Sequence, residues 1–327
     1  MSEAETTAPP PPGENAKDGP AIRAVGLVKH FGAVHAVDGV DLTVPRGAVF
    51  GLIGPNGAGK TTTFGLVCGW VRPSAGVVEV LGTSPRQVSV LKGRLAALPQ
   101  DATLPATTPV LSSLAYLARL QGFSGKAAKD EAARVLALVG LSKWGKVKAQ
   151  GLSHGMAKRV GLAQAFIGHP EVVLLDEPTA GLDPKSAHSV RKLILEMKEE
   201  RTTVVVSSHN LYELEAVCDH AAILDRGRVI ASGPMDELTA ADTEFVVELA
   251  DPPERYEAFS RAVSDLEAVT AASVDPGRRE MVVRFKGAEG RAPDVITAVL
   301  KVLIDGGAHV AGVHRGHGLE RRVLSLT

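Results

Sequence analysis

Hydrophobic and polar positions follow two different patterns along the first 235 residues. From Ala21 to about residue 100, short apolar runs are separated by turn residues, which is typical of β-strands joined by loops. The segments 108–140 and 156–167 carry apolar side chains at every third or fourth position, which predicts amphipathic helices. Strand-like runs then return. We therefore predict an α/β unit over residues 21–235, interrupted by a helical subdomain at about residues 101–168.

The two ends of the chain differ from this unit. Residues 1–20 are rich in Pro, cannot bury enough apolar surface to order themselves, and are expected to form a disordered tail. Residues 236–327 are expected to form a small C-terminal α+β domain of roughly βαββαβ order. Its strand-like runs lie at residues 245–249, 268–274, 281–285 and 308–313, and its clearest helix at 292–304.

Composition narrows the class of protein. The chain has 36 Lys and Arg against 37 Asp and Glu, so it has no overall basic excess to drive nucleic-acid binding. No apolar run approaches the roughly 18 residues needed to span a bilayer, and the N-terminus has no signal-peptide pattern. Cys68 and Cys218 match no metal or redox spacing. We expect a cytoplasmic protein, so any role at a membrane must come through a partner.

A glycine-rich loop between a buried strand and a helix gives the strongest chemical signal. It lies between the apolar run 49–53 and a helix-like segment at 63–71, which is the context of a phosphate-binding P-loop. Its glycines allow backbone N–H groups to surround a polyphosphate, Lys60 is expected to reach the β and γ phosphates, and Thr61 offers a hydroxyl to Mg²⁺. The predicted nucleotide-binding residues are Gly54, Pro55, Asn56, Gly57, Ala58, Gly59, Lys60, Thr61 and Thr62.

An acidic pair follows a second buried run at residues 172–175. At the end of a central strand, Asp176 is placed to associate with Mg²⁺, and Glu177 is placed to act as general base toward an attacking water. Taken alone, the pair is equally well explained as an exposed Asp-Glu turn after a core strand.

Three further motifs decide between these interpretations. Leu152-Ser153-His154-Gly155-Met156-Ala157-Lys158-Arg159 precedes the acidic strand, Glu177-Pro178-Thr179-Ala180-Gly181-Leu182-Asp183-Pro184 continues from it, and Ser207-Ser208-His209 ends the next strand. With these motifs in this order, residues 21–233 resemble the ATP-binding cassette (ABC) family of ATPases. The resemblance implies a P-loop NTPase cassette of α/β class with a helical subdomain insert, and ATP and Mg²⁺ as its cofactors.

The resemblance also implies roles for the residues around one nucleotide. It makes Gly54 to Thr62 the Walker A loop and Asp176-Glu177 the end of Walker B. Gln100 matches the Q-loop glutamine that senses Mg²⁺ and the water, and His209 matches the switch histidine that contacts the γ-phosphate. Phe31 matches the aromatic residue that stacks on adenine, with a core aromatic as the competing interpretation.

The remaining motif residues are expected to act on a second subunit. Ser153 and Gly155 match the signature loop, which in the family binds the γ-phosphate of ATP held by the other subunit, and Asp183 matches the D-loop. The signature differs from the commonest form, LSGGQ, at His154 and Met156. This form looks like a subset of exporter-type cassettes that commonly have one cassette per chain, a separate membrane subunit and an extra C-terminal region.

The resulting hypothesis is the ATP-hydrolysing subunit of an exporter-like ABC transporter, of the multidrug or antibiotic-export type. Its expected partners are an integral-membrane permease and a second ABC ATPase subunit, most simply a second copy of this chain. The protein would then lie at the inner face of the cell membrane. The alternative is a soluble, non-transport ABC ATPase that acts in complex assembly. A P-loop kinase or GTPase leaves residues 152–156 unexplained.

Overall fold

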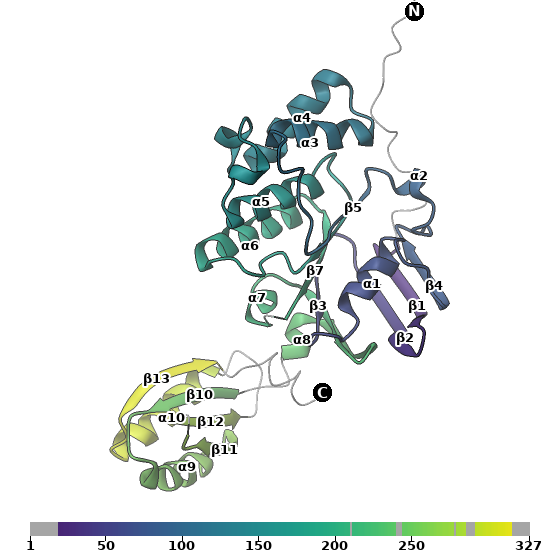
Figure 1. The fold of residues 1–327 in the computed structure, drawn as a ribbon. Helices are drawn as coiled ribbons and strands as arrows, with labels where there is room; N and C mark the ends of the chain where they lie inside the picture. Colours follow the sequence, from purple (N-terminus) through teal and green to yellow (C-terminus); the bar gives the residue numbers. More distant parts are fainter. Residues whose placement is uncertain (1–18, 210, 240–243, 278, 286–291, 316–327) are drawn as a thin grey trace, which may run out of the picture. The chain divides into compact units, whose positions relative to one another are not determined.

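The computed structural model describes residues 19–209, 211–239, 244–277, 279–285 and 292–315 (Figure 1). Most of the Pro-rich tail lies outside this part of the chain. The chain divides into two compact units, 1–235 and 236–327. The short helix α8 (Met235–Thr239) lies where the first unit passes into the second.

A six-stranded sheet forms the centre of the first unit. Its order is β5-β6-β7-β3-β8-β9, with all pairs parallel except the last. The strands are β3 (Val49–Ile53), β5 (Leu95–Leu98), β6 (Val172–Asp176), β7 (Thr203–Ser208), β8 (His220–Asp225) and β9 (Arg228–Pro234). Every residue of β3, β6 and β7 is buried, because helices and a second sheet cover both faces. The carboxyl ends of these three adjacent strands therefore meet at one edge.

A second, antiparallel sheet of order β2-β1-β4 completes the core. It contains β1 (Ile22–Phe31), β2 (Val34–Val44) and β4 (Ala75–Val80). Helix α1 (Lys60–Val67) contributes Phe64 and Leu66 to one apolar cluster with side chains of both sheets, such as Leu27 and Leu174. Helix α1 is thereby fixed against both sheets, and its first residue lies in the glycine-rich loop.

The helical subdomain follows the short helix α2 (Val88–Leu91) and strand β5. It contains α3 (Val110–Gln121), α4 (Gly125–Leu138) and α5 (His154–Ala165), separated by two 3₁₀ turns at Ser142–Trp144 and Ala149–Gly151. Gly122 ends α3 with a φ of 111°, a conformation that favours glycine. After β6 the chain forms α6 (Pro184–Glu199), and α7 (Leu211–Glu215) follows β7. The predicted α/β class with a helical insert is confirmed.

In the described part of the C-terminal unit after α8, an antiparallel sheet packs with helices α9 and α10. Its elements are β10 (Glu244–Leu249), a 3₁₀ turn (Pro253–Arg255), α9 (Tyr256–Ser264), β11 (Val269–Asp275), β12 (Glu280–Phe285), α10 (Ala292–Asp305) and β13 (Val310–Arg315). The sheet order is β11-β12-β10-β13. Phe245, Met281 and Phe285 on one sheet face pack with Tyr256 and Leu303 of the helices. This succession is the βαββαβ order that the hydrophobic pattern predicts.

Candidate functional site

The glycine-rich loop connects β3 to α1 and is packed tightly on both sides. A Cβ atom on Gly54 would lie 2.4 Å from the Leu224 carbonyl oxygen, and one on Gly59 would lie 2.5 Å from that of Ala36. Gly59 also has a φ of 101°, which side chains rarely allow. Only glycine fits at these two positions, so the loop brings bare backbone against β2 and β8.

Lys60 folds back over this loop. Its Nζ donates to the carbonyl oxygens of Gly54 at 2.7 Å and Pro55 at 3.2 Å, and it lies 3.9 Å from Glu177 Oε1. Only 7% of Lys60 is exposed. This burial lowers the pKa of Lys60, while the carboxylates of Glu177 and Asp176 raise it. The ammonium group is thus a desolvated cation held among carbonyls and carboxylates, where an anionic ligand can compete for it.

Asp176 is held between two hydroxyl groups. Its Oδ2 accepts a hydrogen bond from Thr61 Oγ1 at 3.1 Å, and its Oδ1 accepts one from Ser207 Oγ. Among the described residues, no cluster of three His, Cys, Asp or Glu side chains could enclose a metal ion. Mg²⁺ is commonly held by one or two protein oxygens together with substrate phosphates, so the Thr61 and Asp176 pair fits this ion when a nucleotide is bound.

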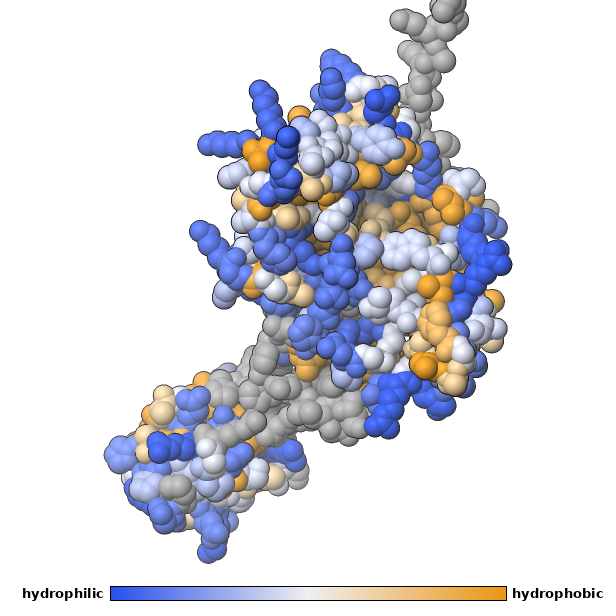
Figure 2. Space-filling view, in the orientation of Figure 1, coloured by the Kyte–Doolittle hydropathy of each residue, from blue (hydrophilic) through white to orange (hydrophobic). Residues whose placement is uncertain are grey.

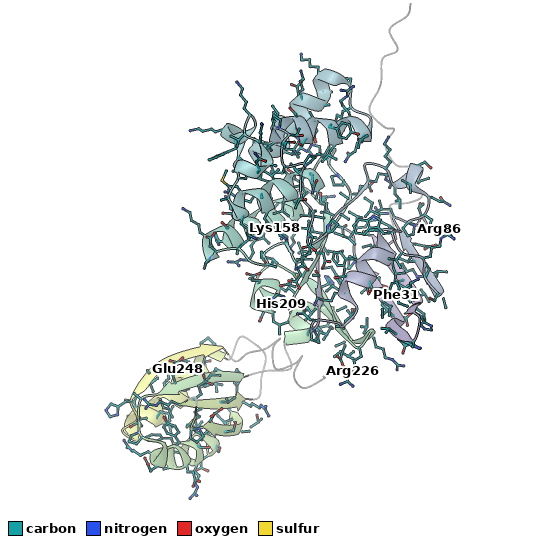
Figure 3. All side chains as sticks on the ribbon, viewed as in Figure 1. Phe31, Arg86, Lys158, His209, Arg226 and Glu248 are labelled. Atoms are coloured by element: carbon teal, nitrogen blue, oxygen red, sulfur yellow. The ribbon has the colours of Figure 1, made fainter. Side chains whose placement is uncertain are left out.

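Glu177 is buried in an unusual backbone conformation. Its φ is 49°, and its N–H donates to the carbonyl and hydroxyl oxygens of Ser207 at 3.2 and 3.0 Å. Its Oε2 lies 2.9 Å from Nδ1 of His209, which follows β7 (Figure 3). A non-glycine residue with positive φ is strained and persists only where neighbours hold it. Ser207 provides that restraint on the Glu177 backbone and also donates to the Asp176 carboxylate.

A cleft of about 320 Å³ opens beside these groups. Gln100 and Glu177 line it together with residues of the glycine-rich loop. Residues 34–36 of β2 form another part of its wall, which was not identified from the sequence. Phe31 is not among the lining residues; it is 52% exposed at the end of β1, with Lys29 Nζ 4.9 Å from its ring centroid (Figure 3). Phe31 is therefore a surface residue and not a core aromatic.

The residues that match the signature loop and the D-loop lie outside this cleft, and Gly155 and Asp183 both lie close to Ser186. Ser153 precedes α5 and accepts a hydrogen bond from Met156 N at 3.4 Å, while Asp183 precedes α6 and accepts from Ser186 Oγ at 2.6 Å. Hydrogen bonds from Ser186 hold the pKa of Asp183 below its usual range. A Cβ on Gly155 would lie 3.0 Å from Ser186 Oγ. None of Ser153, Gly155 and Asp183 lines the cleft of its own chain.

A second link between the two strand-end loops was also not identified from the sequence. Thr179, two residues after Glu177, donates its hydroxyl to Glu213 Oε2, and Arg191 of α6 lies 3.2 Å from Glu213 Oε1. Glu213 is on α7, four residues after His209. In the sequence, only the position of Glu213 near His209 could have indicated a role at this site. That position indicates a contact with Thr179 only when β6 and β7 are known to be neighbouring strands.

A glycine loop between β3 and the start of α1, a buried lysine and a carboxylate pair at the end of β6 define a P-loop nucleotide-binding protein. The family model described as "ABC transporter" matches residues 37–180. The daunorubicin/doxorubicin resistance ATP-binding protein DrrA of Streptomyces peucetius is 34% identical over 78% of each chain. The linearmycin resistance ATP-binding protein LnrL of Bacillus subtilis is 30% identical over 94% of this chain and 98% of its own.

Solved structures agree with these sequence matches. CbiO1 from Clostridium perfringens, described as part of the ABC transporter complex cbiONQ, superposes with a TM-score of 0.62 at 26% identity, over 68% of this chain and 92% of its own. The chain therefore belongs to the ABC transporter family, and it is an ATP-binding, ATP-hydrolysing member of it. Within the described residues, no helix is long and apolar enough to cross a membrane.

Proposed function

We propose that this chain powers the export of an antibiotic-like compound through a separate integral-membrane permease. The observation that carries the proposal is the likeness to DrrA and LnrL, both named for resistance to such compounds, and the likeness to LnrL extends over 94% of the chain. The signature loop, with His154 and Met156, also resembles the form found in a subset of exporter-type cassettes.

The geometry of the cleft supports a specific role for each of its residues in ATP hydrolysis. The loop amides and Lys60 bind the β and γ phosphates, and Thr61 and Asp176 would hold Mg²⁺, which would neutralise charge on the phosphates. Glu177 accepts a proton as the water oxygen bonds to the γ-phosphorus and the bond to the β,γ-bridging oxygen breaks. ADP and inorganic phosphate are the products. His209 positions the γ-phosphate and the Glu177 carboxylate.

Two copies of the chain are proposed to close over ATP. Ser153, Gly155 and Asp183 do not line their own cleft, so their expected phosphate contacts require a second subunit. ATP between two subunits shifts the equilibrium toward the closed dimer by its differential affinity for the closed and open states. Hydrolysis removes that advantage and reopens the dimer.

Gln100 offers a route from the nucleotide to the permease. It lines the nucleotide cleft and also a groove of about 490 Å³ formed by residues 100–106, 149–152 and one side of α5. Lys158 of α5 donates its Nζ to the Gln100 carbonyl oxygen at 2.9 Å, which ties the helical subdomain to this loop. We propose that a cytoplasmic helix of the permease enters this groove and moves with the loop.

Co-expression with a neighbouring membrane protein tests the function. A candidate permease is a protein of about six spans, each near 20 apolar residues, encoded beside this chain. The complex should purify from membranes and transport a hydrophobic antibiotic into inside-out vesicles when ATP is added. The variant Lys60→Ala should lose this transport. Purification of the chain with soluble partners alone, at full ATPase activity, would instead support the non-transport alternative.

A further inference from the structure

The helical subdomain has a charge balance unlike that of the rest of the chain. Residues 101–168 contain nine Lys and Arg against three Asp and Glu, while the remaining residues contain 27 against 34. The formal net charge of −1 for the whole chain conceals this asymmetry. A strongly basic part within an otherwise acidic protein indicates an anionic partner for that part.

Only some of these cations have partners within the protein. Arg134 pairs with Glu131, Lys158 donates to Gln100, and Arg159 donates to the Val139 carbonyl oxygen. The other six side chains are exposed and make no hydrogen bond or ion pair with any residue that the structure describes. These six are Arg119, Lys126, Lys129, Lys143, Lys146 and Lys148.

The six cations lie on α3, which has exposed apolar side chains, and near both of its ends. Tyr116 and Leu120, one turn apart, are 62% and 56% exposed. Residues 143–148 lie at the start of α3, where Val110 N donates to the Val147 carbonyl oxygen at 3.0 Å. This segment also holds Trp144, which is 39% exposed. Lys126 and Lys129 follow the short turn at the other end of α3, about 18 Å away by helix rise.

We call these nine residues, the six cations with Tyr116, Leu120 and Trp144, the basic ridge. Figure 2 shows hydrophilic side chains projecting from this part of the molecule with apolar residues between them. Surfaces that bind at a membrane–water interface typically combine exposed Lys and Arg with Trp, Tyr and Leu. A nucleic acid would use the cations, but it would gain little from Leu120.

We propose that the basic ridge binds the anionic headgroups of the membrane lipids that surround the permease. The cations approach the lipid phosphates while the three apolar side chains enter the interface between headgroups and acyl chains. This inference rests on the proposed function, because the permease is what brings the cassette to the membrane. The ridge itself needs no permease and can be tested with the purified chain.

Vesicle co-sedimentation tests the ridge directly. The full-length chain should bind vesicles of phosphatidylglycerol and phosphatidylcholine, and bind poorly to phosphatidylcholine alone. Each basic residue near an anionic surface changes the partition coefficient about fivefold, so Lys126→Gln/Lys129→Gln/Lys143→Gln should weaken binding by about a hundredfold. Raising the salt to about 0.5 M should release the wild-type protein, because the cations are exposed to screening.

A second triple variant controls for the loss of net charge. Lys192→Gln/Arg261→Gln/Lys301→Gln removes three cations from outside the subdomain and should bind anionic vesicles as the wild type does. The proposal would be overturned if both triple variants lost the same amount of binding to anionic vesicles. It would also be overturned if the wild type bound neutral vesicles as well as anionic ones, or bound RNA more tightly than vesicles. ATP hydrolysis should stay normal in the ridge variant, so loss of vesicle binding alone leaves the proposed function intact.

Discussion

At the scale of single residues, the site depends on how Glu177 is presented. Its carboxylate is 2.9 Å from His209 and 3.9 Å from Lys60, and its backbone is held by Ser207. The Glu177→Gln variant should still bind ATP but lose hydrolysis by roughly 10²-fold or more, because it removes the general base. It should then accumulate an ATP-bound dimer. Turnover and size-exclusion chromatography with ATP measure both effects.

The exposed Glu199→Gln variant removes the same charge far along α6 and should hydrolyse ATP normally. Near-normal turnover in Glu177→Gln would remove Glu177 from its proposed role. A variant that no longer bound ATP would show instead that the carboxylate matters for the shape of the cleft.

Ser207 is predicted to matter through its contacts with the Asp176 carboxylate and the Glu177 backbone. It is fully buried, it donates to Asp176, and its oxygens accept the Glu177 N–H. The Ser207→Ala variant removes one partner of a buried carboxylate, which costs about 1–3 kcal/mol in the free energy of unfolding. It should also raise the Mg²⁺ concentration needed for half-maximal ATPase activity, because Asp176 is less well oriented. Urea unfolding and a Mg²⁺ titration measure the two effects.

The exposed Ser273→Ala variant in the C-terminal unit is the matched control and should change neither quantity. If Ser207→Ala lowered stability and left the Mg²⁺ dependence unchanged, Ser207 would be a packing residue only.

At the scale of elements, two contacts among the described residues connect the segments after β6 and β7. His209 contacts Glu177, and Glu213 contacts Thr179 while also facing Arg191. The first contact must loosen when a γ-phosphate takes up His209, but the second can persist. We therefore expect Glu213 to act as a positioning residue that keeps the two loops in register during turnover.

The Thr179→Val and Glu213→Gln variants test this link. Thr179→Val removes the hydroxyl at constant volume and should lower kcat severalfold with little change in ATP affinity, while Thr179→Ser should restore kcat. The double variant should be no worse than the poorer single variant, since both remove one interaction. Additive losses, or a change in ATP affinity without a change in kcat, would contradict the positioning role.

The sequence predicts elements well where their pattern is long or continuous. The runs 49–53 and 172–175 correspond to β3 and β6, because a strand covered on both faces is apolar throughout. Strand β5, of four residues, was not identified, since so short a run has no period to detect. Helix α1 begins at Lys60 rather than at residue 63, and it ends at Val67 rather than at residue 71 because Gly69 adopts a positive φ.

Only the site residues that belong to a sequence motif could be predicted. The nine loop residues, Asp176 and Glu177 could be placed because they follow buried strands, whereas His209 was assigned only through the resemblance to the ABC family. Ser207, Glu213 and the cleft wall at residues 34–36 act through contacts between segments distant in the chain. Those contacts depend on which strands are neighbours, and hydrophobic periodicity along one strand carries no information about its neighbour.

At the scale of the whole molecule, the two compact units are expected to unfold separately. The C-terminal unit contains a buried carboxylate, Asp251, which accepts hydrogen bonds from the His309 N–H at 2.6 Å, from the His309 ring at 3.1 Å and from Arg255 at 2.9 Å. Hydrogen bonds from His309 and the charge of Arg255 lower the pKa of Asp251. A lowered pKa in the folded state stabilises the unit above the unfolded pKa, which is about 3.9, and this stabilisation is lost as pH falls through the folded value.

The Asp251→Asn variant therefore has a pH-dependent effect on one unit only. It should lower the unfolding temperature of the C-terminal unit near pH 7, and the difference from wild type should shrink as the pH falls below the unfolded pKa of about 3.9. Both tryptophans, Trp70 and Trp144, lie in the first unit, so their fluorescence reports that unit while far-UV circular dichroism reports both. We expect the variant to shift a transition seen by dichroism and to leave the fluorescence transition in place.

Coincident shifts in the two signals would show that the units unfold as one cooperative body. A difference between variant and wild type that stayed constant from about pH 7 to pH 3 would show that the lowered pKa of Asp251 does not contribute to the stability of the unit. The Asp275→Asn variant is the control, because Asp275 is an exposed carboxylate of the same unit at the end of β11. Two results together support the proposal: Asp251→Asn shifts only the transition seen by dichroism, and this shift disappears in acid. The first indicates that the C-terminal unit unfolds separately, and the second that the charge of Asp251 stabilises it.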